Sequence, residues 1–258
     1  LARMAVDETR MGRYEDKIVK NKAKAKIVWY KLKGVKSRGI LRYLDDIGVV
    51  EVAKPIGVIG CVAPTTNPTM TPNHNAMIAL KGGNAIIVCP HPRAKQTGVK
   101  TVELMRQALK ELGYPEDLIQ IVPEPTMEAS GLIMQLCDAC VSTGGPGMVK
   151  AAYSSGKPAF GVGAGNVQSL VDTDVDLEEA AAKIAKSRTY DNGVLCTCEQ
   201  CVHIPADRFD EMVRLLVAQG GAYIGRDEDI AALRAAMFHD GSINKAVVGA
   251  SPQEIASM

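Results

Sequence analysis

The sequence predicts an α/β protein built on a doubly wound parallel sheet, and two observations support this. Of the 258 residues, 47% are hydrophobic but only 4% are aromatic. The core must therefore consist of Val, Ile, Leu, Ala and Met, as in most parallel sheets. After Lys54, short apolar strands alternate with helical patterns, which is typical of consecutive βα units. A chain of this length allows one large α/β domain or two smaller ones.

The first 54 residues precede this alternation. Apolar residues recur at helical spacing from Ala2 to about Leu32, with Gly12 as a break, so two helices are expected. Apolar runs within residues 35–54 indicate a β-hairpin or extended arm. Residues 1–42 carry 13 Lys or Arg against 4 Asp or Glu. We expect this basic start to form solvated helix faces rather than a nucleic-acid site.

The alternating part gives four strand–helix pairs. Strands are expected at 56–62, 85–89, 118–122 and 139–142, followed by helices at about 73–80, 94–112, 127–136 and 147–154.

A second unit is expected after Pro158. The glycine-rich residues 160–165 lead into its first strand. Strands are expected at 169–171, up to Ile204 and at 246–248, with helices at 177–189, 206–218 and 227–237. The chain ends soon after the last of these strands, so we expect this second unit to be incomplete.

The loops after the four strands are the candidate ligand sites, because an open α/β sheet binds ligands beyond the carboxyl ends of its strands. The loop at 143–147, Thr-Gly-Gly-Pro-Gly, opens a helix with small residues, so its backbone N–H groups can approach a phosphate. An ordinary glycine turn explains that loop equally well. Residues 161–165 do not match the dinucleotide fingerprint, because Asn166 replaces the third glycine and a strand follows.

The seven cysteines are irregularly spaced, and no signal peptide is recognisable at the start. We therefore expect reduced thiols in the cytoplasm rather than disulfides. Two Cys-x-x-Cys pairs, at 137 and 198, formally resemble a zinc site. No metal is expected, because Cys137 ends a helix whereas Cys140 lies in the next strand.

Cys196 follows Asp-Asn-Gly at a sharp entry into a strand, where a side chain can face a cleft. The spacing alone leaves a nucleophile and a core thiol equally open. Cys198 competes for the role, because side chains at i and i+2 share one face of a strand.

Five segments together resemble the CoA-acylating branch of the aldehyde dehydrogenase superfamily, including the aldehyde dehydrogenase half of bifunctional aldehyde-alcohol dehydrogenases. The resemblance extends over nearly the whole chain. The segments are Ala63-Pro-Thr-Thr-Asn-Pro68, Pro90-His-Pro-Arg-Ala-Lys95, Thr143-Gly-Gly-Pro-Gly-Met-Val-Lys150, Gly161-Val-Gly-Ala-Gly-Asn166 and Asp191-Asn-Gly-Val-Leu-Cys196.

The resemblance implies an aldehyde dehydrogenase-like fold and a set of roles. Cys196 occupies the position of the catalytic nucleophile, and Asn67 that of the side-chain donor in the oxyanion hole. NAD and coenzyme A are the implied cofactor and co-substrate. The implied cofactor-binding residues are Thr65, His91, Pro92, Gly144, Gly145 and Gly163.

The resemblance also implies a domain map. Residues 1–36 and 54–158 form the NAD-binding domain, and residues 37–53 form an arm through which family members make dimers or tetramers. Residues 159–258 form the first part of a catalytic domain. Family members are much longer, so we expect the chain to be a fragment and further catalytic residues, among them a glutamate that holds the nicotinamide ribose, to follow Met258.

Val162 favours acyl-CoA over a free acid as the product. Hydrolytic family members have a glutamate at the matching position, and a valine cannot take a proton from water. A hydrolytic aldehyde dehydrogenase and a non-catalytic truncated chain that binds nucleotide or assembles with partner subunits stay open. The sequence names neither the aldehyde nor a preference between NAD and NADP. Acetaldehyde, propionaldehyde, succinate semialdehyde and sulfoacetaldehyde are all admissible.

The expected partners are a small aldehyde and further copies of the chain. No membrane partner is expected, because four prolines and three asparagines interrupt the longest uncharged stretch, residues 55–80. The expected location is the cytoplasm, which includes the interior of a bacterial microcompartment.

Overall fold

The computed structural model describes residues 1–258, which form two compact units. The first unit comprises residues 1–9 and 17–164, and the second comprises residues 10–16 and 165–258. No helix combines the length and the apolar character needed to cross a membrane.

A five-stranded parallel sheet with the strand order β5-β4-β3-β6-β7 organises the first unit. Its strands are β3 (Val58–Val62), β4 (Ala85–Cys89), β5 (Ile119–Ile121), β6 (Ala139–Thr143) and β7 (Ala159–Val162). The chain builds outward from β3 to β5 and then returns to add β6 and β7 on the other side of β3. This reversal confirms the doubly wound sheet, with its switch point between β3 and β6.

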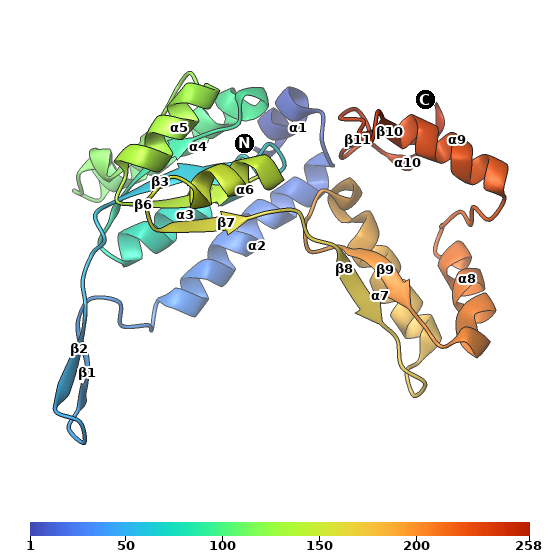
Figure 1. Ribbon diagram of the computed structural model, residues 1–258, viewed down its shortest axis with the longest axis horizontal. Helices are drawn as coiled ribbons and strands as arrows, with labels where there is room; N and C mark the ends of the chain where they lie inside the picture. The colour runs from blue at the N-terminus through green and yellow to red at the C-terminus, as the bar shows by residue number, and fades with distance from the viewer. The chain divides into compact units, whose positions relative to one another are not determined.

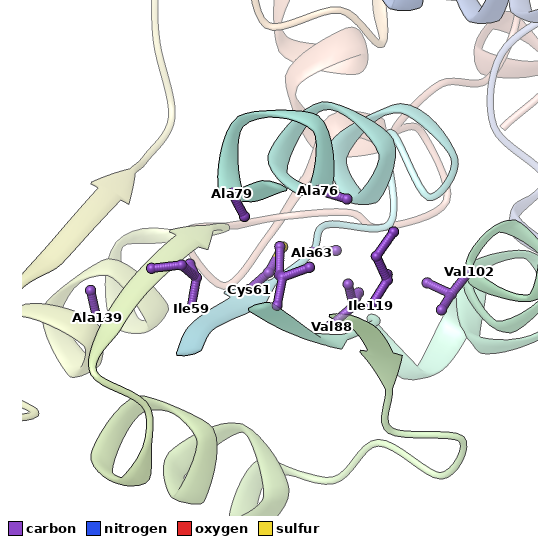
Figure 2. Packing of buried hydrophobic residues seen from close by; sticks show 10 residues of the cluster. Ile59, Cys61, Ala63, Ala76, Ala79, Val88, Val102, Ile119 and Ala139 are labelled. Carbon is purple, nitrogen blue, oxygen red and sulfur yellow. The ribbon is translucent and has the colours of Figure 1, made fainter. Parts of the chain in front are cut away.

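Helices cover both faces of this sheet (Figure 1). The four helices are α3 (Met70–Lys81), α4 (Lys95–Glu111), α5 (Met127–Leu136) and α6 (Pro146–Tyr153). Figure 2 shows one of the two cores, where Ala76 and Ala79 of α3 and Val102 of α4 pack on Ile59 and Cys61 of β3. On the other face, residues of α5 and α6 pack against alternate strand residues such as Val62 and Cys89. Burial on both faces explains the continuous apolar runs of these strands.

The glycine-rich stretch contributes the edge strand β7 of this same sheet, rather than opening the second unit. A methyl group at Gly161 would lie 2.7 Å from Val149 Cγ1 and 2.8 Å from Tyr153 Cε2. The backbone N–H of Gly161 also donates to the Tyr153 hydroxyl at 3.1 Å. Glycine is therefore required here for α6 to pack closely on β7.

Two helices and a hairpin precede the sheet in the chain. The helices α1 (Ala2–Thr9) and α2 (Tyr14–Leu32) confirm the predicted pair, and α2 begins with three residues of the second unit. Strands β1 (Gly39–Leu44) and β2 (Val49–Ala53) pair in antiparallel fashion and form the predicted hairpin. None of its residues is buried, and Figure 1 shows it extending away from the sheet.

The second unit contains a short parallel sheet of β8 (Val167–Leu170) and β9 (Glu199–His203). Its helices are α7 (Leu177–Thr189), α8 (Phe209–Ala218), α9 (Asp227–Met237) and α10 (Pro252–Ala256). Val171, Leu177, Ala181 and Met212 form its core. A short hairpin joins β10 (Phe238–His239) to β11 (Ser242–Ile243).

The strand predicted at 246–248 is wrong, because this segment forms a turn. Asn244 accepts hydrogen bonds from the backbone N–H groups of this segment. Its carbonyl oxygen accepts from Val247 N at 3.1 Å, and its side-chain Oδ1 accepts from Ala246 N at 3.0 Å. The apolar Val247 and Val248 suggested a strand, but the asparagine supplies turn hydrogen bonds instead.

Candidate active site

Cys196 lies in a turn between α7 and β9, three residues before the strand begins. Before it, and separated from it by Val194 and Leu195, residues Asp191, Asn192 and Gly193 have φ values of 52°, 52° and 69°. Three consecutive left-handed residues reverse the chain sharply, and Asp, Asn and Gly are the residues that tolerate this conformation best. Cys196 is exposed, whereas Val194, two residues earlier, is buried. The turn therefore presents the Cys196 thiol to solvent.

Cys198 has the opposite environment, with an exposed fraction of 0%. Its thiol donates to the carbonyl of Leu195 at 2.8 Å and accepts from Arg188 Nη1 at 3.6 Å. The premise that Cys196 and Cys198 share a strand face is wrong, because both precede β9. The structure thus distinguishes the two candidates. The Cys196 thiol is accessible, whereas the buried Cys198 thiol hydrogen-bonds to the backbone of the turn.

Four further thiols are buried in the cores of the first unit and are poor nucleophiles. Burial raises the pKa of Cys61 to about 12 and that of Cys140 to about 11. Burial also raises the pKa values of Cys89 and Cys137. Thiolates react and thiols do not, so these four remain inert at neutral pH. Cys201 is only partly exposed, which leaves Cys196 as the one exposed cysteine of the chain.

Gly165, the first residue of the second unit after β7, lies close to the Cys196 backbone. A methyl group at Gly165 would lie 3.8 Å from the carbonyl oxygen of Cys196. Gly165 belongs to the second unit, so within that unit one glycine approaches the backbone of the turn that carries the thiol.

Asn67 lies in the first unit, in the loop between β3 and α3. Its carbonyl accepts from Thr71 N at 3.2 Å, which ties the residue to the first turn of α3. Its side chain is half-buried, and its amide donates to Thr66 Oγ1 at 3.5 Å, the outer limit of a hydrogen bond. An amide group has two donor hydrogens, so Asn67 keeps donor capacity for a ligand.

The loops after β3 and β6 both end at the switch point of the sheet, where ligands of such sheets bind. Thr65 lies in the first loop and is partly exposed; Gly144 and Gly145 lie in the second. Gly145 precedes α6 without a side-chain cap, and a methyl group added to it would meet no atom within 4 Å. Pro146 has no N–H, and Met148 N and Val149 N donate to the Gly145 carbonyl at 3.0 and 3.1 Å. The amides of Gly145 and Gly147 are therefore the donors at the start of α6 that an anionic group could use.

The remaining predicted cofactor residues lie apart from that loop pair. His91 and Pro92 are exposed after β4, and His91 Nδ1 accepts from Arg93 N at 3.1 Å. Gly163 is exposed after β7, beside Val149. Thr65, Asn67, Gly144 and Gly145 gather at one sheet edge, whereas Cys196 belongs to the second unit.

Sequence reasoning missed the residues that hold the turn before Cys196. Asp191 is fully buried and contacts the segment 10–16 near the start of the chain. The Asp-Asn-Gly sequence signals a left-handed turn, but nothing in the sequence signals its distant partner.

A family model described as "Aldehyde dehydrogenase family" matches residues 26–244. Among curated proteins, the chain is 46% identical over 257 residues to a succinate-semialdehyde dehydrogenase (acetylating) of Clostridium kluyveri. That alignment covers 100% of this chain and 57% of the relative, so the chain spans little more than half the relative's length.

The chain is also similar to solved structures of aldehyde dehydrogenases. An acetylating aldehyde dehydrogenase from Geobacillus thermoglucosidasius matches with a TM-score of 0.94 and 40% identity, covering 100% of this chain and 57% of that one. A propionaldehyde dehydrogenase from Rhodopseudomonas palustris, solved with bound CoA and an acylated cysteine, matches with a TM-score of 0.83 and 35% identity. It covers 99% of this chain and 58% of that one.

Proposed function

The chain belongs to the aldehyde dehydrogenase family, and on this premise we propose that it takes part in the NAD-dependent, CoA-acylating oxidation of a small aldehyde to an acyl-CoA. The observation that carries the proposal is the exposed Cys196 thiol on a sharply reversed turn, in a chain whose other cysteines are buried or partly buried. An acylated cysteine in a structural relative supports this assignment.

The proposed reaction begins when the Cys196 thiolate adds to the aldehyde carbon and forms a thiohemiacetal. Its oxygen carries the new negative charge, and Asn67 Nδ2 and the Cys196 backbone N–H are the proposed donors to it. When the carbonyl re-forms, a hydride leaves that carbon and a thioester remains on Cys196. The CoA thiolate then attacks the thioester, which releases acyl-CoA and regenerates the Cys196 thiolate.

The switch-point loops fit a dinucleotide. Gly144 and Gly145 form the loop that we assign to a pyrophosphate, with the amides of Gly145 and Gly147 as its donors, and Thr65 lies in the neighbouring loop. The exposed His91, Pro92 and Gly163 are the further residues that we assign to the cofactor. When bound, NAD supplies the acceptor for the hydride.

Val162 supports CoA rather than water as the acyl acceptor. Water attack on a thioester needs a base to remove a proton, and a valine side chain has none. A thiolate is a strong nucleophile without such help. The thioester on Cys196 should therefore persist until CoA arrives.

A burst experiment tests this function. Full-length protein mixed with aldehyde and NAD but no CoA should release about one equivalent of NADH per active site, and CoA should then restore turnover. Val162→Glu should raise the CoA-independent rate. Steady release of free acid by the unmutated protein would instead support a hydrolytic enzyme, and absence of any NADH would support a non-catalytic chain.

Assays with a panel of aldehydes would identify the substrate. Succinate semialdehyde, acetaldehyde, propionaldehyde and sulfoacetaldehyde should be compared by kcat/KM with NAD and with NADP. The preferred pair then defines the substrate and the cofactor.

The hairpin of β1 and β2 is the proposed arm of a homodimer or homotetramer. Tyr43, Ile47 and Val50 are exposed to 62%, 65% and 46%. A lone two-stranded hairpin is marginally stable in water, so a second copy covering it would stabilise it. Tyr43→Lys should shift the mass measured by light scattering toward the monomer, whereas Leu112→Lys, at an exposed residue outside the hairpin, should not.

We propose a cytoplasmic location because all seven cysteines are free.

A further inference from the structure

The turn before Cys196 has a backbone conformation that needs external support. Asp191 and Asn192 both have φ values of 52°, in the left-handed region that side-chain-bearing residues rarely adopt. Such backbone persists only where the surrounding contacts determine it. The contacts of this turn therefore hold its backbone, and Cys196 follows Asn192 by four residues.

Two aspartates connect this turn to the segment 10–16. Arg13 N donates to Asp191 Oδ1 at 2.8 Å, and Asp191 N donates to Asp16 Oδ2 at 2.9 Å. Each segment thus supplies a carboxylate that accepts a backbone N–H of the other. The Tyr190 hydroxyl adds a third bond, to the carbonyl of Asp16 at 2.7 Å. Hydrogen bonds to charged acceptors are the stronger kind.

The arrangement is partly buried, and neighbouring residues reinforce it. Asp191 has an exposed fraction of 0%, and the carboxylate of Asp16 lies 3.6 Å from Arg13 Nε. Gly249 joins both segments, because its carbonyl accepts from Gly12 N at 3.0 Å and from Asn192 Nδ2 at 3.1 Å. The turn is therefore held by the segment 10–16, more than 170 residues earlier in the sequence, and by Gly249, which follows the turn.

We propose that Asp16 and Asp191 form a clasp that positions Cys196 for attack on the aldehyde. The clasp rests on the proposed function, in which Cys196 is the nucleophile. Neither aspartate is placed at a reacting atom, so both are positioning residues that act through the backbone of the turn. Displacing a reacting group by about 1 Å costs about 10²-fold in rate, so a relaxed turn should slow the first turnover.

The test compares Asp16→Ala, Asp191→Ala and the conservative Asp16→Asn and Asp191→Asn in the full-length protein. The matched control is Asp172→Ala, which removes an aspartate of the same unit whose hydrogen bonds reach only Thr173. The alanine variants should lower the rate of the NADH burst at least about 10-fold with little change in KM for NAD. The asparagine variants keep an acceptor oxygen and should recover most of that loss.

Hydrogen exchange supplies a readout that does not depend on the chemistry. Amides in a peptide covering residues 190–197 should exchange faster in the alanine variants and not in the control. Where an alanine variant does not fold, Tyr190→Phe removes one bond of the clasp and should give a smaller change in the same direction. If Cys196→Ala retains turnover, the proposed function fails, while exchange still tests the clasp itself. Unchanged exchange, or faster exchange with an undiminished burst rate, would overturn the clasp.

Discussion

Cys196 and Cys198 are two residues apart but have opposite environments. The exposed Cys196 can meet a substrate, whereas Cys198 is enclosed and bonded to Leu195 and Arg188. This difference of accessibility, rather than of residue type, favours Cys196 over Cys198 as the proposed nucleophile.

Replacing each of these thiols should therefore have a different effect. Cys196→Ala should lower kcat by several orders of magnitude, because no nucleophile remains. Cys198→Ala should lower kcat far less. Cys198→Ser keeps a hydrogen-bond donor to the Leu195 carbonyl and should lower kcat least. Steady-state kinetics measures all three, and a mass-spectrometric acyl adduct on Cys198 would reverse the assignment.

Asn67 should act in the transition state, because an oxyanion donor has little to bind in the ground-state aldehyde. Asn67→Ala should lower kcat by roughly 10²- to 10³-fold and leave the Kd of NAD nearly unchanged. Asn75→Ala serves as a comparison, because Asn75 donates to the buried Cys61 instead. An unaltered kcat in Asn67→Ala would remove this residue from the mechanism.

At the scale of elements, α1 supplies the missing cap of α4. The residue before α4 is Ala94, whose side chain cannot accept a hydrogen bond. Glu8 of α1 accepts instead from Gln96 N at 2.8 Å, from Thr97 N at 2.8 Å and from Thr97 Oγ1 at 2.6 Å. A carboxylate at a helix N-terminus also interacts favourably with the helix dipole. The Glu8 carboxylate thus accepts from the free N–H groups at the start of a helix that is far from it in sequence.

Glu8→Ala should lower the free energy of unfolding by about 1–3 kcal/mol, because it leaves these donors unsatisfied. Glu8→Gln keeps an acceptor and should cost less. Asp7→Asn, on the same helix but exposed, is the control. Urea denaturation gives the comparison, and equal midpoints for Glu8→Ala and Asp7→Asn would contradict the role of the cap.

At the scale of the whole molecule, the buried thiols make stability depend on alkaline pH. Burial raises the pKa of Cys61 from its ordinary 9.0 to about 12. The folded protein therefore holds this proton more tightly than the unfolded chain. The resulting stability is fully present below pH 9 and is lost as the pH rises toward 12.

The thermal midpoint of unfolding should accordingly fall above about pH 9. In Cys61→Ala the fall should be shallower, because one of the groups that release a proton on unfolding is gone. Cys201→Ala, which removes a thiol that is not buried, should follow the unmutated protein. Identical slopes in Cys61→Ala and the unmutated protein would show that this thiol does not govern the alkaline limb.

The sequence by itself determined the elements whose signals are local. Helices at 127–136, 177–189 and 227–237 have the predicted bounds. Two of them begin after a capping side chain, since Thr126 accepts from Ala129 N and Asp176 accepts from Glu179 N. The apolar runs of β3 and β4 likewise predicted buried parallel strands. The motif order indicated Cys196 and Asn67 as candidate catalytic residues, and their roles stay predictions.

Only the tertiary structure decided which distant segments pair. It made residues 159–162 the edge strand of the first sheet and turned the apolar residues 246–248 into a turn. It also enclosed Cys198 and brought Asp16 to Asp191 across 175 residues. Periodicity and capping act over a few residues, whereas these contacts depend on which surfaces remain unpaired once the sheets have formed. No local pattern in the sequence encodes that choice.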